Sequence, residues 1–290
     1  MQDEGAGIAY VNFSANITGL SSDTRHSFVA CASNAAGETI NAMAGTFTTT
    51  PLSTVKVTSV ANGASFGQSF APGMLMTVFG TGLSSGSPQA ASAPLPLLAS
   101  NGTAVTINGI AAPLLYISAT QINFQLPYEV PAGQATLSVL FGGQTGSINF
   151  AVQAAAPGIF LDAQTGHIVP NESAAAGSTI GIFVTGAGTV MPPEQTGNAP
   201  TAGTTPVPEL PVTVTVGGVP ATLSYFGIPN WSIGTLQINF VVPSTLAAGT
   251  QLVVVTTGGM ASPPRSTHSY KMSPSWGNGH PGRVTKVRQC

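Results

Sequence analysis

The segment Gly82-Leu83-Ser84-Ser85-Gly86 fits the G-x-S-x-G pattern, in which the serine can act as a nucleophile. Asp162 and His167 follow in the chain order that the acid and base of such a triad take. The pattern needs a strand, a tight turn and then a helix, so that the serine stands exposed above a parallel sheet. Here Ser87-Pro88 and a proline-rich loop follow instead of a helix. The sequence therefore predicts a surface loop around Ser84, and a serine hydrolase or esterase is the alternative.

Side chains that could bind metals or transfer protons are scattered along the chain. His167 is the sole histidine between residues 55 and 262, and a metal would need further ligands beside it. Asp162 and Glu172 could join for calcium, but the sequence has no acidic calcium-binding loop. The other acids of this region have no neighbour in sequence that would complete a glycosidase pair: Glu129, Glu194 and Glu209. We expect a loop histidine at 167, no metal site and no cofactor.

Two further groups of side chains could contact a ligand. Four amides could line a groove, although we expect them to bind neighbouring backbone where loops cross a sheet: Gln121, Asn123, Gln237 and Asn239. Asn230 and Trp231 lie in a segment, residues 228–233, that has no counterpart in a similar region earlier in the chain. An exposed loop tryptophan can stack on a sugar or anchor a partner. We expect Trp231 to cover the core, with ligand binding by Asn230 and Trp231 as the alternative.

All these residues lie on a duplicated framework. The tetrapeptide Gln121-Ile122-Asn123-Phe124 returns intact as Gln237-Ile238-Asn239-Phe240, an offset of 116 residues (237 − 121). Upstream, three small residues return 104 positions later: Gly73, Thr81 and Gly82 become Gly177, Thr185 and Gly186. The offsets differ only by small insertions. The chain therefore contains two copies of a unit of about 100 residues, the usual size of one domain.

Each copy is predicted to consist of short β-strands. The 35 glycines and 23 prolines punctuate β-rich runs, as is typical of sandwiches and barrels. Ile122 and Phe124 alternate with polar residues and so share one face of a strand. Asn108-Gly109 is a strong hairpin signal between two such runs. No segment has a helical period, and we predict an all-β chain.

Charge is scarce and unevenly placed. Only 6% of the 290 residues are charged and the net charge is −2, so no long-range field attracts nucleic acid or an anionic membrane. Five of the seven basic residues lie after position 264: Arg265, Lys271, Arg283, Lys286 and Arg288. They belong to a Gly/Pro/Ser-rich stretch that also holds Trp276. We predict a flexible basic tail over residues 263–290.

Cysteine content and apolar runs bear on the compartment. Cys31 and Cys290 cannot make a disulfide framework, and we expect two free thiols unless the tail folds back on the first segment. No run of 18 apolar residues occurs, so we expect no membrane insertion. Residues 1–5 lack the basic start and apolar region of a signal peptide. Either the protein stays inside the cell or the chain is part of a longer exported protein.

Residues 10–50 resemble the second half of a fibronectin type III domain, which favours the exported protein. The matching residues are Leu20, Thr24, His26, Ala32, Asn34, Gly37, Phe47 and Thr49. Ser22 replaces the proline of the family pattern, and His26 replaces its corner tyrosine. A complete domain needs about 100 residues in two sheets, so we expect an incomplete one at residues 1–50. His26 is then a half-buried residue at a sheet corner.

Residues 55–260 resemble a family of uncharacterised C-terminal twofold β domains from large exported acidobacterial proteins. The motifs that carry the resemblance are Val60-Ala61-Asn62-Gly63-Ala64-Ser65-Phe66, Ala71-Pro72-Gly73, Phe79-Gly80-Thr81-Gly82-Leu83, residues 105–113, residues 116–125, Ala156-Pro157-Gly158-Ile159-Phe160, Thr185-Gly186-Ala187-Gly188 and Gln237-Ile238-Asn239. Pro263-Pro264 and the tail depart from it. The resemblance implies immunoglobulin-like sandwiches at the end of a secreted or surface protein, often behind fibronectin-type repeats, with no agreed activity.

We therefore predict tandem immunoglobulin-like β-sandwiches at residues 55–154 and 155–262, behind the incomplete fibronectin type III-like segment. The expected function is a non-catalytic structural or binding module of a secreted or cell-surface bacterial protein, acting as a stalk, an adhesion domain or a ligand-presenting pair. Its partners would be a cell-surface protein or a polysaccharide. The hydrolase and a carbohydrate-binding module are the alternatives, and the oligomeric state is open.

Overall fold

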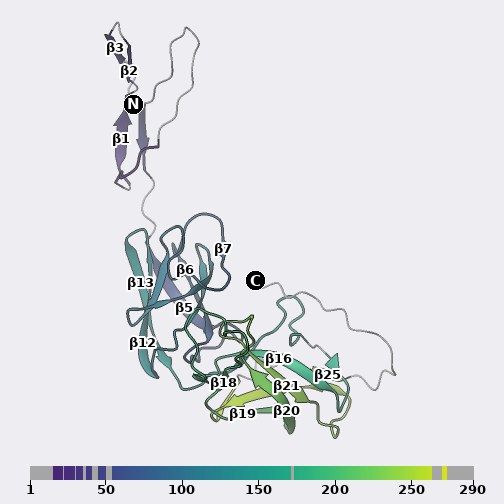
Figure 1. Ribbon diagram of the computed structural model, residues 1–290. Coiled ribbons are helices and arrows are strands. Elements are labelled where there is room, and N and C mark those ends of the chain that lie inside the picture. The colour runs from purple at the N-terminus through teal and green to yellow at the C-terminus, as the bar shows by residue number, and fades with distance from the viewer. Residues whose placement is uncertain are drawn as a thin grey trace. The chain divides into compact units, whose positions relative to one another are not determined.

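Every regular element in the described residues is a β-strand, as the sequence predicts. The computed structural model describes residues 16–21, 23–29, 31–34, 37–40, 45–49, 54–170, 173–262 and 270–272 (Figure 1). The chain divides into two compact units, residues 1–53 and residues 54–290. Within the described parts, no helix is long and apolar enough to cross a membrane.

The first unit contains two antiparallel strand pairs. Strand β1 (Arg25–Phe28) pairs with β4 (Gly45–Thr48), and β2 (Cys31–Asn34) pairs with β3 (Gly37–Ile40). The half-buried His26 ring lies 5.6 Å from the Phe47 ring, and its Nε2 is 3.3 Å from the Ser21 carbonyl oxygen. A corner tyrosine bonds the backbone a few residues upstream in the same way. This geometry supports a structural role for His26, while the strands expected over residues 10–15 lie outside the described residues.

The first sandwich of the second unit has two sheets. Their strands are β5 (Lys56–Asn62), β6 (Leu75–Thr81), β7 (Gln89–Ala90), β8 (Ala104–Ile107), β9 (Ile110–Ala112), β10 (Leu114–Ile117), β11 (Gln121–Gln125), β12 (Gly133–Phe141) and β13 (Gln144–Val152). One sheet has the order β5-β6-β11-β10-β7 and the other β13-β12-β8-β9. The predicted Asn108-Gly109 hairpin joins β8 and β9, with backbone φ angles of 50° and 82° that suit its tight turn.

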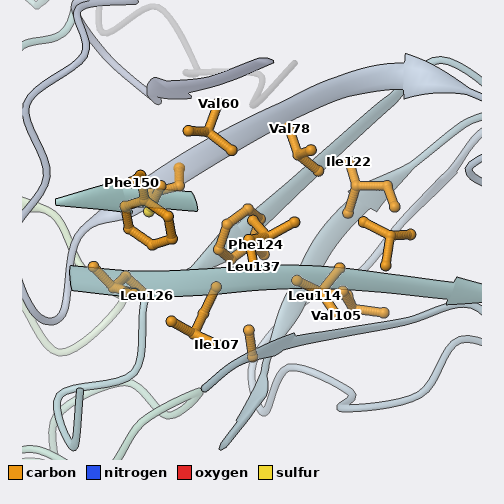
Figure 2. Close-up of a cluster of buried hydrophobic side chains, with 14 of the residues drawn as sticks. Val60, Val78, Val105, Ile107, Leu114, Ile122, Phe124, Leu126, Leu137 and Phe150 are labelled. Carbon is orange, nitrogen blue, oxygen red and sulfur yellow. The ribbon is translucent and has the colours of Figure 1, made fainter. Parts of the chain in front are cut away.

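Alternating apolar residues of both sheets meet in one core (Figure 2). Val60, Val78 and Phe124 come from the first sheet, and they face Ile107 and Leu137 of the second. Because successive side chains of a strand point to opposite faces, each strand gives one row to the core and one to the outside. Once one row of side chains on a strand is buried in the core, the residues between them must face outward, so the alternation in the sequence predicts both sets.

The second sandwich repeats this arrangement. Its principal strands are β14 (Gly158–Ile159), β16 (Thr179–Thr185), β19 (Val212–Val216), β20 (Val219–Gly227), β21 (Leu236–Val241), β23 (Val253–Thr257) and β24 (Met260–Ala261). Hydrogen bonds join neighbouring strands in the order β14-β16-β21-β20-β19-β23-β24. Buried residues of β16 and β21, among them Ile182 and Phe240, form one core with Val214 and Val255 of β19 and β23.

One strand passes through both layers of the second sandwich. The start of β20 pairs with β19 as far as Ala221, and from Thr222 onward β20 pairs with β21. The first sandwich divides the equivalent stretch into β9 and β10, with Pro113 between them. Proline has no N–H for a ladder bond, whereas Thr222, at the equivalent position, has one. The proline lies where the first copy divides the stretch into two strands, and the threonine lies where β20 passes from one partner strand to the other.

Short strands complete the second sandwich. They are β15 (Ser173–Ala174), β17 (Val190–Met191), β18 (Val207–Pro208), β22 (Gly249–Gln251) and β25 (Tyr270–Met272). Strand β25 pairs with both β15 and β22, so part of the stretch predicted to be a flexible tail belongs to a sheet. The predictions for Trp276, Cys290 and the cysteine 31 thiol concern atoms outside the described residues.

Candidate functional site

Ser84 lies just after β6, in the loop that the G-x-S-x-G pattern singles out. Its side chain is 6% exposed, and its Oγ accepts a hydrogen bond from Nδ2 of Asn101 at 2.6 Å. The same amide donates to the Ser85 carbonyl at 3.0 Å. The following residues 85–90 are exposed and lead into the short strand β7, with no helix among them. Residues 85–90 are thus exposed, whereas the Ser84 side chain is buried and bonded to Asn101.

Asp162 and His167 lie together on a hairpin of the second sandwich. The Asp162 N–H donates to the His167 carbonyl at 2.8 Å. The Asp162 carboxylate accepts bonds from the Thr165 N–H at 2.8 Å and the Gln164 N–H at 2.9 Å. These bonds, the Thr165 hydroxyl and nearby His167 lower the pKa of the exposed Asp162 carboxyl. The carboxylate therefore caps its own turn, and the described partner of Ser84 is Asn101 rather than a histidine.

Two further acids, Glu129 and Glu209, accept hydrogen bonds from hydroxyl groups. The Thr196 hydroxyl donates to Glu129, and the Thr189 hydroxyl donates to Glu209. Desolvation raises the pKa of Glu194. Among the described residues, no three His, Cys, Asp or Glu side chains form a group that could hold a metal.

The repeated tetrapeptides build the same surface on both sandwiches. On the first, the Gln121 Nε2 donates to the Asn123 Oδ1 at 2.9 Å, and on the second the Gln237 Nε2 donates to the Asn239 Oδ1 at 3.0 Å. The flanking aromatic residues also match by register: Phe79 and Tyr116 in the first copy, Phe183 and Tyr225 in the second. The amides bind each other on the outer face of the sheet, so the expectation that they bind backbone is wrong for this pair of bonds.

Trp231 distinguishes the second surface from the first. Its side chain is 61% exposed, and its ring packs edge-on against Phe183, with centroids 5.6 Å apart and planes at 90°. Phe183 lies between the buried Ile182 and Val184 and faces outward. The prediction that Trp231 covers the core is therefore wrong, because the ring stands on the outside of β16. Asn230 beside it is also exposed.

Buried polar side chains join the two sandwiches. Gln125 accepts from the Gly197 N–H at 2.7 Å and donates to the Gly73 carbonyl at 3.1 Å. Thr185 accepts from the Leu75 N–H at 2.8 Å and donates to the Gly234 carbonyl at 2.7 Å. The Asn62 amide donates to the Ala156 carbonyl at 3.1 Å. These three side chains, which we call the joint, fix one sandwich against the other.

Tyr128 lies beside the joint and packs against the core of the second sandwich. Burial raises the pKa of its phenol above the ordinary value of 10, and nearby Glu194 and Glu129 raise it further. A raised pKa in the folded state gives stability that is complete below pH 10 and is lost as the pH rises above it. As the pH rises from 9 to 11, we expect the free energy of unfolding of the parent to fall by about 1 kcal/mol more than that of Tyr128→Phe, which has no phenol to titrate.

Urea unfolding at a series of pH values measures this difference. Tyr116→Phe, which removes a half-buried hydroxyl from the outer face of the first sandwich, is the matched control. If both variants lose stability with pH as the parent does, Tyr128 is not the group responsible.

Two hollows in the described part of the chain are small. One at the joint, lined by Tyr128, Gly186 and Leu236 among others, has a volume of about 10 Å³. That is room for one water. Another, between β5 and β13, has a volume of about 220 Å³ and is lined by residues that include Phe70 and Asn149. Both are below the usual 300–1,000 Å³ of small-molecule pockets.

The described residues form several antiparallel sheets, and the class of fold is all-β and immunoglobulin-like. Residues 65–154, which make up most of the first sandwich, match the family model described as IPT/TIG domain. This confirms the predicted fold class. No curated protein sequence matches the chain.

Solved structures that are similar to this chain include three bacterial proteins. One is SGBP-B of a Bacteroides ovatus mixed-linkage glucan utilization locus in complex with a mixed-linkage heptasaccharide, at 15% identity, covering 87% of this chain and 55% of that one, with a TM-score of 0.37. Another is the Escherichia coli adhesin FdeC, at 14% identity, covering 80% of this chain and 68% of that one, with a TM-score of 0.25. A third is invasin, a bacterial integrin-binding protein, at 15% identity, covering 77% and 40%, with a TM-score of 0.24. The chain spans about half of the first of these proteins.

Proposed function

We propose that this chain is a non-catalytic binding module of a secreted or cell-surface bacterial protein, of the kind in which acidobacterial twofold β domains occur. The two sandwiches act as one rigid body, which holds a binding face at a distance from the point where the module joins the rest of the secreted or cell-surface protein. The joint carries this proposal: three buried polar side chains from β5, β11 and β16 bond across it. Buried hydrogen bonds of this kind hold domains in one orientation, which a ligand-presenting module needs and an independent pair of domains does not.

The hydrogen bonds made by Ser84 and Asp162, the candidate catalytic residues, also support a module without catalysis. A nucleophilic serine needs a base within hydrogen-bond reach, and a base needs a third group that orients it. Ser84 is bonded to an amide, which cannot take up its proton, and Asp162 caps a turn. The Ser84 hydroxyl and the Asp162 carboxylate thus make hydrogen bonds that stabilise their own loops.

A hydrolysis assay tests the absence of catalysis. We expect the full chain and its Ser84→Ala variant to cleave p-nitrophenyl acetate at the same rate as a control protein of equal concentration. Turnover in the parent that falls at least tenfold in Ser84→Ala would show that the hydrolase reading is right. Since Ser84 is bonded to Asn101, urea unfolding of the variant must first show that it is folded.

Binding is tested by sedimentation of the full chain with insoluble polysaccharides and with whole bacterial cells. We expect retention on at least one of these surfaces, without release of soluble sugar. A chain that stays in the supernatant with every surface would contradict a binding module and leave only a spacer.

A further inference from the structure

We propose that the outer face of the second sandwich, at Trp231 and Phe183, binds an uncharged polysaccharide built of glucose-type sugars. This inference rests on the proposed binding function and specifies its ligand. The face consists of Trp231, Phe183, Gln237, Asn239 and Tyr225, and we call it the Trp231 face. Four of these residues are neighbours in the sheet register of β16, β21 and β20.

The loop that carries Trp231 is bonded to the rest of the sandwich at its start and is closed by a turn of its own. Ile228 is buried, and its N–H donates to the Pro206 carbonyl at 2.9 Å. Ser232 is buried too, and its N–H donates to the Pro229 carbonyl at 3.0 Å. The T-shaped contact with Phe183 then holds the indole upright on the sheet. An exposed indole held in one orientation loses little freedom when a flat ligand stacks on it.

The chemistry beside the indole suits hydroxyl groups. Gln237 lies opposite Phe183 in the ladder, and its amide is bonded to that of Asn239. A side-chain amide has one acceptor oxygen and two N–H donors, more than this single bond uses. Both amides and the Tyr225 side chain are half-buried, so a ligand lying on the sheet can reach them. Aromatic surface next to paired donors and acceptors fits a sugar, which presents C–H groups on its faces and hydroxyls at its rim.

Charge selects among polysaccharides. Residues 173–262 contain no lysine, arginine or histidine, and their acids are Glu194 and Glu209. A sulfated or uronic acid polymer would therefore find no cation among residues 173–262, which supply every residue of the Trp231 face, and its charges would lose hydration there without compensation. Glucose-type rings carry their hydroxyls equatorially, so that both ring faces are lined by C–H groups and can stack on an indole. The face therefore favours a neutral glucan.

The first sandwich supplies an internal comparison. It repeats the phenylalanine, the two amides and the tyrosine but lacks the inserted loop and its tryptophan. If the amides sufficed, the chain would hold two equivalent sites. If the indole is required, as we propose, the second sandwich alone binds.

Affinity electrophoresis with two polymers of one backbone tests the proposal. Hydroxyethyl cellulose is neutral, and carboxymethyl cellulose is the same chain with carboxylates. We expect hydroxyethyl cellulose to retard the full chain, carboxymethyl cellulose to retard it at least tenfold less, and Trp231→Ala to lower affinity for the neutral polymer at least tenfold. Phe66→Ala is the matched control, because Phe66 is an aromatic residue of the first sandwich that is 63% exposed, and we expect it to bind as the parent does.

Fluorescence reports the contact directly. The chain has two tryptophans, so Trp276→Phe leaves Trp231 as the sole indole. We expect its emission to shift to the blue on adding hydroxyethyl cellulose, and Trp231→Phe to keep part of the affinity. Binding that is unchanged in Trp231→Ala, or stronger binding of carboxymethyl cellulose, would overturn the proposed face while leaving the binding module intact. Release of reducing ends from the polymer would instead overturn the non-catalytic function.

Discussion

Replacing Gly186 with alanine is expected to destabilise the second sandwich by about 3 kcal/mol or more. Gly186 follows β16 with a backbone φ of +85°, and a left-handed conformation alone costs an alanine roughly 1–2 kcal/mol. A Cβ at this position would lie 2.0 Å from the Ala156 carbonyl oxygen, so the backbone must move. That carbonyl also accepts the Asn62 bond of the joint, and the shift would therefore weaken the contact between the sandwiches.

Gly218→Ala separates the two costs of this substitution. Gly218 has a φ of +81° in the hairpin between β19 and β20, with nothing within 4 Å of an added Cβ. We expect it to cost roughly 1–2 kcal/mol, from conformation alone. Urea unfolding of both variants measures the difference. Equal losses would show that the close approach at Ala156 contributes nothing.

Much of the fold follows from local patterns in the sequence. The repeated tetrapeptide fixes which residues of β11 and β21 are buried, because alternate side chains of a strand must face opposite sides. Ile122 and Phe124, and their equivalents Ile238 and Phe240, are fully buried as that rule predicts. The Asn108-Gly109 hairpin forms because both residues accept positive φ. These features depend on neighbours in the chain, so the sequence alone determines them.

Features that depend on distant residues could not be predicted in the same way. The stretch is divided at Pro113 in the first copy and continuous through Thr222 in the second, where β20 changes its partner from β19 to β21. The exposure of Trp231 depends on Phe183, which stands 48 positions earlier (231 − 183). A tryptophan in a loop has the same local signal whether it covers a core or stands outside it. Only the packing against β16 decides between these positions.

The serine motif shows that a local pattern can also match where the corresponding geometry is absent. Five-residue matches to G-x-S-x-G arise readily in a chain with 35 glycines, so the match carries little information about geometry. The amide of Asn101, which holds Ser84, is 17 residues away and belongs to no known motif. The sequence does carry one sign of the joint. Gln125 breaks the repeat, because the position 116 residues later holds Val241.

Gln125→Ala is expected to lower the free energy of unfolding by about 3 kcal/mol. The side chain is 1% exposed, and its loss leaves the Gly197 N–H and the Gly73 carbonyl buried without this partner. Each unsatisfied buried group costs roughly 1–3 kcal/mol. Hydrogen exchange at Gly197 and urea unfolding measure the effect, and we expect protection of that amide to fall with stability. Gln121→Ala, which removes a half-buried amide bonded only to Asn123, should cost about 1 kcal/mol or less. If Gly197 stays protected in Gln125→Ala, and the two variants are equally stable, the sandwiches are held together by apolar packing, and the buried amide does not set their orientation.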